Sequence, residues 1–303
     1  MFQRFFAAGS AAAQLSFNRG RHRALAFLLP LLHPLLLLAV AATLAGCGGG
    51  IGFNPVVTAV KVQSAQYGRS AVILIGGRDL RSTFTVDTQG GCTTPAFAAN
   101  SSTETLVLNC RVARVGEIPI SVLAADGALL FKTSFTVPNP QVVFSTSGGA
   151  FTVELDPVAA PITVDNFLGY VNSGYYKDTL FHRVIAGFVA QGGGYTTGLV
   201  KKPGQLAPIV LESNKGLSNL RGTVAMARTA APDSATSEFF VNLVDNKFLD
   251  YSSAASPGYA VFGKVVQGLS VIDAMATQPT GSVGGFGDVP LADIAITLAL
   301  QVQ

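Results

Sequence analysis

The sequence predicts a mainly β protein with two small helices, and three observations indicate this fold class. Most of the chain after residue 54 consists of short apolar runs, rich in Val, Ile, Thr and Phe and separated by turn residues. A helical period of apolar residues is found in segments 161–172 and 269–276. The tripeptide Pro138-Asn139-Pro140 predicts a boundary between two domains, because a residue before proline is held extended.

Residues 1–46 have the pattern of a secretory leader. They contain no acidic residue, and an apolar run from Ala24 to Leu44 follows their basic start. A basic start, an apolar middle and a small-residue end are typical of a signal peptide rather than of a membrane-spanning helix, and Pro30 and Pro34 also argue against a spanning helix. The four basic residues are Arg4, Arg19, Arg21 and Arg23.

The leader ends in Leu44-Ala45-Gly46-Cys47, which resembles the lipobox of bacterial lipoproteins. In that class the cysteine is acylated and becomes the new N-terminus, so Cys47 is the expected lipidation site, and several acyl chains anchor it firmly. Gly48 replaces the aspartate that retains lipoproteins in the inner membrane. We therefore expect a lipid anchor on the periplasmic side of the cell envelope, in the outer membrane, followed by a flexible tether at 47–54.

Removal of the leader changes the net charge of the chain. The remaining 303 − 46 = 257 residues carry 20 − 4 = 16 basic against 17 acidic residues, so the formal charge becomes −1 instead of +3. The basicity therefore belongs to the leader, and the composition gives no support to nucleic-acid binding.

Residues 55–138 predict a small β-sandwich that resembles immunoglobulin-like domains. Glycine pairs and Asp126-Gly127 supply turns between its apolar runs. The segment has no histidine or cluster of acids, which favours a spacer over a binding module. The predicted strands are Val56–Val62, Ala71–Ile75, Ser82–Val86, Thr105–Cys110, Ile118–Leu123 and Leu129–Val137.

Two cysteines remain after Cys47. Cys92 and Cys110 lie 110 − 92 = 18 residues apart and could form a disulfide in an oxidising compartment. Such a loop is worth about 3 kcal/mol in the chain-entropy model. Two unpaired buried thiols are the alternative.

Residues 139–303 predict strands and the two helices. A hairpin is expected around Ser147-Gly148-Gly149, and the C-terminal end alternates between apolar and mixed positions, as one face of a strand would. The apolar stripe of the first helix is Val164, Phe167, Leu168 and Val171. The apolar face of the final strand is predicted to be Ile294, Ile296, Leu298, Leu300 and Val302.

Five sequence blocks in this segment point to a function. The block FHRVIAGFVAQGGG (181–194) places Arg183 eight residues before Gln191, and it is followed by RGTVAMAR (221–228), SEFFVNL (237–243), FLD (248–250) and YAVFGKV (259–265). In this order and spacing they resemble cyclophilin-type peptidyl-prolyl cis-trans isomerases of the bacterial branch, over 141–303. The resemblance implies a closed antiparallel β-barrel with a helix at each end.

The implied reaction is rotation about an X–Pro bond, whose barrier of about 20 kcal/mol comes from amide resonance. Rotation removes that resonance and turns the imide nitrogen into a hydrogen-bond acceptor. A donor aimed at this nitrogen stabilises the twisted state more than the planar one. A guanidinium suits this task because it is always charged and carries several donors. Such chemistry needs no nucleophile or metal, so we expect no cofactor.

The resemblance assigns catalysis to Arg183, Gln191 and Phe240. Arg183 would donate to the imide, Gln191 would hold the arginine and contact the substrate backbone, and Phe240 would line the proline pocket. The remaining substrate-binding candidates are Phe188, Val189, Ala227, Arg228, Glu238, Phe248, Leu249 and Tyr259.

Three positions depart from the family pattern. Glu238 stands where glutamine is usual, so it could pair with Arg183, compete with substrate and make activity weaker or pH-dependent. Val189 replaces the usual methionine. Phe248 stands where eukaryotic members carry tryptophan, which implies low cyclosporin sensitivity.

Other functions are less well supported by the sequence. His182 is the single histidine after the leader, and a Ser-His-Asp hydrolase would have to use it. Two alternatives to the isomerase remain, namely a non-catalytic chaperone that holds proline-containing segments and an envelope docking module at 55–138. The expected partners are proline-containing segments of unfolded or exported proteins and, through the lipid anchor, the membrane; nucleic acid is not expected, and we expect a monomer.

Overall fold

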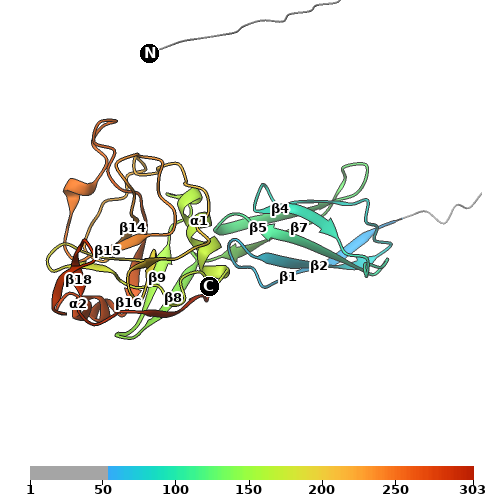
Figure 1. The fold of residues 1–303 in the computed structure, drawn as a ribbon. Coiled ribbons are helices and arrows are strands. Elements are labelled where there is room, and N and C mark those ends of the chain that lie inside the picture. Colours follow the sequence, from blue (N-terminus) through green and yellow to red (C-terminus); the bar gives the residue numbers. More distant parts are fainter. Residues whose placement is uncertain (1–53) are drawn as a thin grey trace, which may run out of the picture. The chain divides into compact units, whose positions relative to one another are not determined.

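A computed structural model describes residues 54–303 of the chain (Figure 1). The predicted leader, the lipidation site Cys47 and residues 47–53 of the tether lie outside the described residues. None of the helices in the described range has the length and apolar character needed to cross a membrane.

Residues 56–137 form two antiparallel sheets. The four-stranded sheet has the order β1-β2-β5-β4, and the three-stranded sheet has the order β3-β6-β7. Buried side chains occupy alternate positions along strands of these sheets, as in β5, where Leu106 and Leu108 are buried. The strands are β1 Val56–Gln63, β2 Ser70–Arg78, β3 Thr85–Asp87, β4 Cys92–Phe97, β5 Thr105–Val112, β6 Gly116–Leu123 and β7 Leu129–Val137.

Five of the six expected strands are present, most of them with shifted ends, the expected strand Ser82–Val86 begins in a turn and is reduced to Thr85–Asp87, and β4 was not predicted. Its sequence CTTPAF has mostly exposed positions and no alternation of buried and exposed residues. Pairing with β5, with an irregularity between Thr93 and Ala96, defines this strand instead. The side-chain pattern of a segment does not reveal a strand that forms only because a neighbouring strand pairs with it.

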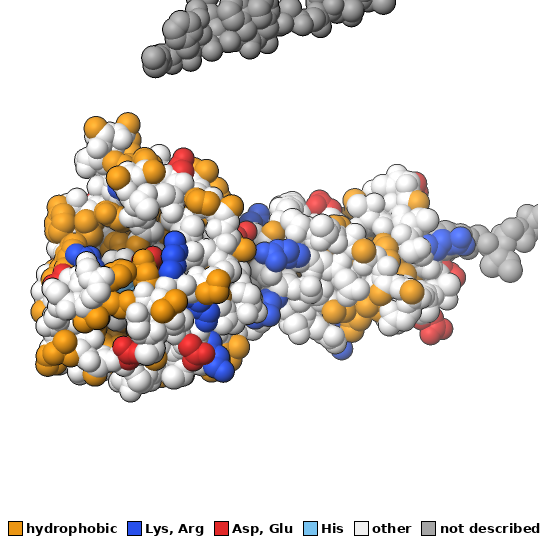
Figure 2. All heavy atoms as spheres, in the orientation of Figure 1, with side chains coloured by type: hydrophobic (Ala, Val, Ile, Leu, Met, Phe, Trp, Pro, Cys, Tyr) orange, Lys and Arg blue, Asp and Glu red, His pale blue; other side chains and the backbone are white. Residues whose placement is uncertain are grey.

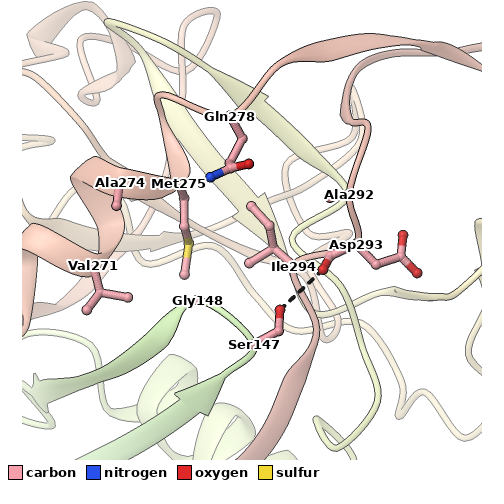
Figure 3. Close-up of a pocket in the computed structure, with 9 residues that line it drawn as sticks. All are labelled: Ser147, Gly148, Val271, Ala274, Met275, Gln278, Ala292, Asp293 and Ile294. Carbon is pink, nitrogen blue, oxygen red and sulfur yellow. Dashed lines mark hydrogen bonds between the residues drawn. The ribbon is translucent and has the colours of Figure 1, made fainter.

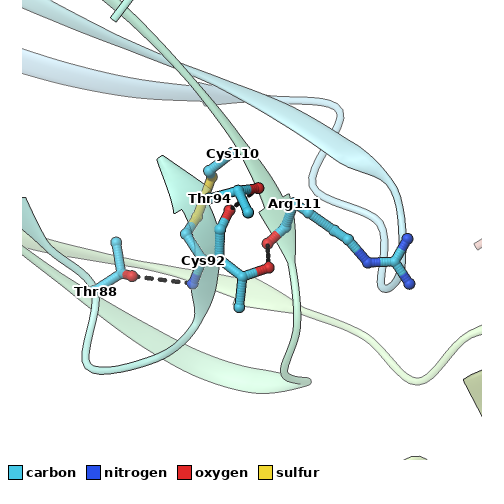
Figure 4. Close-up of a disulfide and its surroundings, with 6 residues drawn as sticks. Thr88, Cys92, Thr94, Cys110 and Arg111 are labelled. Atoms are coloured by element: carbon cyan, nitrogen blue, oxygen red, sulfur yellow. Dashed lines mark hydrogen bonds between the residues drawn. A yellow bond between two sulfur atoms is a disulfide. The ribbon is translucent and has the colours of Figure 1, made fainter. Parts of the chain in front are cut away.

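A disulfide joins β4 to β5 (Figure 4). Cys92 and Cys110 are bonded, with their Cα atoms 5.5 Å apart. The backbone N–H of Cys92 also donates to Oγ1 of Thr88 at 3.0 Å, as Figure 4 shows. The covalent bond therefore fastens the edge strand to the centre of its sheet.

Residues 141–301 form an eight-stranded antiparallel sheet of order β10-β11-β15-β14-β16-β9-β8-β19, with two helices. Its strands are β8 Gln141–Thr146, β9 Gly149–Leu155, β10 Arg183–Ile185, β11 Val189–Gly192, β14 Thr223–Met226, β15 Phe239–Asn242, β16 Val261–Gln267 and β19 Ile296–Gln301. The helices are α1 Pro161–Asn172, α2 Leu269–Met275 and the 3₁₀ turn η1 Lys247–Leu249. Two small hairpins pair β12 Tyr195–Thr196 with β13 Val200–Lys201, and β17 Thr280–Val283 with β18 Phe286–Pro290.

The large sheet is curled but not closed, so the predicted closed barrel was wrong. The edge strands β10 and β19 do not pair with each other as a ladder. β10 has only three residues. The segment that precedes β10 contacts the segment that precedes β19 through one isolated β-bridge, between Leu180 and Ala295. A few backbone hydrogen bonds, such as that from the N–H of Phe181 to the carbonyl of Ile294, add to this contact.

The predicted apolar face of the C-terminal strand was also wrong in part. Ile294 and Ile296 are buried, but Leu298, Leu300 and Val302 are about half exposed, and Ala299 and Gln301 are buried instead. The pairing of β19 with β8 is irregular between Ile296 and Leu298. An extra residue there exchanges the two faces for the rest of the strand.

The core packs aromatic rings between α1 and the sheet. α1 begins with Pro161, a favourable first residue, and its predicted apolar stripe is buried. The ring of Phe167 lies 4.8 Å from that of Phe262, and Phe144 stacks on Phe151 at 5.0 Å. The partly exposed side of the same sheet carries the candidate site.

Candidate active site

Strand register brings the three predicted catalytic residues together. In the β10–β11 hairpin Arg183 is directly opposite Gln191, and across the next ladder Gln191 is directly opposite Phe240 of β15. Directly opposed residues project to the same face of a sheet. The eight-residue spacing between Arg183 and Gln191 therefore matches a tight hairpin, which places the guanidinium of one residue beside the amide of the other.

These residues line a hollow of about 290 Å³. Its floor is a small apolar cluster, separate from the main core, that includes Val189, Ala225, Phe240 and Val261. The structure brings nine of the eleven predicted site residues to the hollow: Arg183, Phe188, Val189, Gln191, Ala227, Arg228, Phe240, Leu249 and Tyr259.

The two other candidates lie close by. Phe248 is 72% exposed and stacks on Phe188 with ring centroids 5.8 Å apart, so it extends the apolar rim. Glu238 lies behind Gln191. Other exposed hydrophobic side chains are scattered over the face seen in Figure 2.

Arg183 is only loosely held. Its NH1 donates to Oε1 of Gln191 at 3.4 Å, and its Nε lies 3.8 Å from Oδ2 of Asp288. Both partners of the ion pair are partly exposed, and such pairs contribute little. The guanidinium therefore keeps donor capacity for another acceptor.

Asp288 was not predicted as a site residue. It belongs to β18, where its φ of 57° is in the left-handed region that aspartate tolerates. The hairpin is held against the site by rings: Tyr195 lies 4.7 Å from His182 and 5.1 Å from Phe286. Only the three-dimensional packing brings this carboxylate to Arg183, because the two residues are 288 − 183 = 105 positions apart.

Glu238 does not take the position that the sequence suggested for it. Its carboxylate forms no ion pair with Arg183 within the described residues; it accepts from Nε2 of Gln191 at 3.0 Å, and Nε2 of His182 lies 3.4 Å away. Burial raises the pKa of Glu238, while the hydrogen bond from Gln191 and the charge of Lys201 act in the opposite direction. The amide of Gln191 thus separates the carboxylate from the guanidinium.

His182 is a packed residue. It is 4% exposed, and burial, aided by the charge of Arg183, lowers its pKa to about 4, against the effect of a hydrogen bond from the ring to the backbone of Leu180. The ring is therefore neutral near pH 7, and it supports Glu238 and the β17–β18 hairpin rather than facing the hollow.

Arg228 is held by several contacts with its surroundings. Its Nε donates to the carbonyl of Gly258 at 2.9 Å, NH1 donates to the carbonyl of Thr229 at 2.9 Å, and the guanidinium stacks on Tyr259 at 4.6 Å. The N–H of Ala227 also donates, at 2.9 Å, to the carbonyl of Glu238, so a substrate backbone cannot use it.

Asp250 organises the loop that carries Leu249. It accepts from the backbone N–H and Nδ2 of Asn219 at 2.7 and 2.9 Å, and from the hydroxyl of Ser218. Burial alone would raise the pKa of Asp250, but these hydrogen bonds outweigh it and lower the pKa below its usual value. The aspartate of FLD is therefore a structural residue beside the site.

Other hollows lack this convergence of groups. A cavity of about 280 Å³ between Ser147 and α2 is shown in Figure 3. Its charged residue, Asp293, directs its carboxylate away from the other side chains drawn in Figure 3. This carboxylate accepts a hydrogen bond from the hydroxyl of Thr197. A larger one, of about 410 Å³, is lined by residues such as Glu154, Leu217 and Lys264, and Lys264 is paired with Glu154. No cluster of three His, Cys, Asp or Glu side chains suited to a metal ion occurs between residues 54 and 303.

The curled antiparallel sheet, its two helices and the pocket at β10, β11 and β15 define a cyclophilin-type fold. Residues 141–299 match the family model of cyclophilin-type peptidyl-prolyl cis-trans isomerases, and these 299 − 141 + 1 = 159 residues are more than half of 303. The chain therefore belongs to the cyclophilin-type peptidyl-prolyl cis-trans isomerase family, which is an enzyme class.

Bacterial relatives carry the same name. Peptidyl-prolyl cis-trans isomerase A of Dickeya dadantii is 45% identical over 187 residues, which cover 60% of this chain and 97% of that protein. Peptidyl-prolyl cis-trans isomerase B of Escherichia coli is 48% identical over 157 residues, which cover 51% and 95%. A crystal structure of a Cryptosporidium parvum cyclophilin-type isomerase is 26% identical, with a TM-score of 0.45, and covers 55% of this chain and 98% of that one.

Proposed function

We propose that this protein accelerates cis-trans rotation of X–Pro bonds by aiming the guanidinium of Arg183 at the twisting imide. The observation that carries the proposal is the register that places Arg183, Gln191 and Phe240 side by side around one apolar hollow of about 290 Å³. Phe240 and Val189, both nearly fully buried, offer apolar surface to a proline ring. Arg183, at the edge of that surface, has few hydrogen-bond partners and can act as the donor that the reaction needs.

The catalytic effect follows from differential hydrogen bonding. The planar imide nitrogen is a poor acceptor, and the twisted nitrogen is a good one, so a donor at its position favours the transition state. A barrier lowered by about 7 kcal/mol corresponds to an acceleration of roughly 10⁵. Part of this would come from the charge-assisted hydrogen bond, and part from holding the proline ring in place.

The test compares the purified wild type with Arg183→Ala in an assay of proline-peptide isomerisation. Removing one transition-state donor typically costs about 10²–10³-fold in rate. Equal kcat/KM for the two proteins would leave the second candidate, a chaperone that holds proline-containing segments without turnover. The observation that favours holding is the exposed Phe248, which continues the apolar rim beyond the pocket.

We also propose that the enzyme works on exported proteins from a lipid anchor at Cys47 in the outer membrane, with residues 55–138 as a spacer domain. The leader pattern and the Cys92–Cys110 disulfide, which suits an oxidising compartment, support this setting. Cell fractionation of the wild type and Cys47→Ser tests it. Release of the variant from the membrane fraction is expected, and equal membrane association would contradict the anchor.

A further inference from the structure

We propose that Glu238 is a positioning residue that determines which end of the Gln191 amide faces Arg183. The inference rests on the proposed isomerase function and adds a residue that acts through Gln191 without touching the substrate. It is drawn from the chain of contacts that runs from Arg183 through Gln191 to Glu238.

Donor and acceptor identities allow one arrangement of this chain. The Arg183 guanidinium can only donate and an ionised carboxylate can only accept, whereas the Gln191 amide can do both, at opposite ends. The amide satisfies both neighbours when Oε1 faces Arg183 and Nε2 faces Glu238, as the structure has it. A reversed amide would set N–H against N–H on one side and oxygen against oxygen on the other.

The two contacts are not equally strong. The bond from Arg183 to Gln191 is 3.4 Å long, near the upper limit for a hydrogen bond, whereas the bond to the carboxylate is 3.0 Å and charge-assisted. The orientation of Gln191 is therefore determined mainly on the Glu238 side. A glutamine at 238 could turn its own amide to match either orientation, so it would not make this selection.

Glu238 is itself held in place. Its backbone carbonyl accepts from Ala227, and Nε2 of His182 lies 3.4 Å from its carboxylate. Its side chain lies against Gly194, where an added Cβ would come within 2.5 Å of its Cγ. Any larger residue at 194 would displace the carboxylate, so the glycine is part of the same arrangement.

Protonation of Glu238 should weaken its preference for one orientation of the Gln191 amide, because a protonated carboxyl both donates and accepts hydrogen bonds. Burial raises the pKa of Glu238, so this loss is expected at a higher pH than for an ordinary glutamate. The ionisable groups around it are His182, Lys201 of β13 and Tyr195 of β12, with Arg183 and its partner Asp288 beyond Gln191. Burial lowers the pKa of His182 to about 4, and burial together with Glu238 raises the pKa of Tyr195, so both groups stay mainly neutral between pH 5 and 7.5.

The experiment measures kcat/KM for a proline tetrapeptide from pH 5 to 7.5 by NMR exchange, which needs no coupling protease, with folding verified by circular dichroism at each pH. The wild type is expected to lose activity on the acid side. Glu238→Gln should lose this acid limb and show about two- to threefold lower activity at pH 7.5, since Gln191 then samples both orientations. Glu238→Ala should lose about tenfold at every pH, and the partial recovery in Glu238→Gln separates positioning from a packing defect.

Two further readouts make the test specific. The side-chain N–H₂ resonance of Gln191 should titrate with the acid limb in the wild type and stay constant in Glu238→Gln. The matched control is Glu154→Gln, a carboxyl of β9 that is paired with Lys264 away from the site and should leave the limb in place.

An active wild type that does not lose activity as pH falls, or a Gln191 resonance that does not respond to pH, would overturn the positioning role of Glu238. The proposed isomerase function would be unaffected by either result. A wild type that is inactive at all pH values would instead overturn the proposed function.

Discussion

The pocket has an arginine on each side, and the two differ in how far their surroundings use them. Arg228 donates to two backbone carbonyls at 2.9 Å and stacks on Tyr259, whereas Arg183 has one long bond to Gln191 and one loose, partly exposed ion pair. A guanidinium whose donors are occupied builds structure, and one with spare donors is available to a ligand. The comparison shows that contacts, more than charge, separate the catalytic candidate from the structural residue.

The largest effect on this comparison is expected from Arg183→Lys. Lysine keeps the charge but replaces a planar fork by a single ammonium, which cannot keep the contact with Gln191 while donating to the imide. We expect kcat/KM to fall about 100-fold with thermal stability unchanged, measured by peptide isomerisation and calorimetry. A variant with near wild-type activity would show that charge alone suffices at this position.

The next largest effect should come from the Arg228 side, in Gly258→Ala. Gly258 has a φ of 64°, and a Cβ there would lie 2.6 Å from backbone atoms of Leu249, Asp250 and Tyr251. The backbone would have to move, so we expect a loss of about 3 kcal/mol in the free energy of unfolding. Urea denaturation measures this loss, and a loss below about 0.5 kcal/mol would mean that this loop adapts. Gly127→Ala, a positive-φ glycine with no atom near its Cβ position, is the matched control for the cost of the backbone conformation alone.

A smaller effect with a defined pH dependence is expected for Asp250→Asn. Hydrogen bonds lower the folded-state pKa of Asp250, so its contribution to stability is full above the unfolded-state pKa of about 4 and is lost as pH falls through the folded-state pKa. We expect the variant to be about 1–2 kcal/mol less stable at pH 6. The gap between variant and wild type should shrink below pH 4; a gap that stays constant down to pH 2 would contradict the assignment.

The smallest effect is expected for Asp288→Ala, which removes the ion-pair partner of Arg183. Because the pair is loose and partly exposed, we expect a two- to threefold change in kcat/KM that disappears in 0.5 M salt. A loss above tenfold, insensitive to salt, would mean that Asp288 fixes Arg183 and would make the two sides of the pocket more alike than the structure indicates.

Much of the architecture could be predicted from local patterns. The helix at 161–172, its buried stripe and the hairpin around Ser147-Gly148-Gly149 follow from periodicity and turn chemistry, and the structure confirms them. The spacing of Arg183 and Gln191 is also consistent with the structure, because a tight hairpin places residues eight positions apart directly opposite each other.

The rest depends on interactions between distant segments. The irregular pairing near Ile296 exchanges the faces of β19, and a one-dimensional pattern does not show where pairing shifts. The open edge of the large sheet, the approach of Asp288 and the turning of Glu238 toward Gln191 likewise require the packed chain. The sequence therefore did not reveal Asp288 and gave Glu238 the wrong partner, although it did predict Gln191 as the residue that holds Arg183.

The pairing of β8 with β19 has a consequence for folding. β8 has its hairpin partner β9 beside it in the sequence, but its other edge pairs with β19, whose first residue lies 296 − 146 = 150 positions after the end of β8. Contacts between such distant segments form late, because closing a long loop costs entropy. Until β19 is in place, an uncovered row of backbone donors and acceptors on β8 can capture a foreign strand, so an enzyme proposed to help other chains fold is itself exposed to aggregation until its last strand has paired.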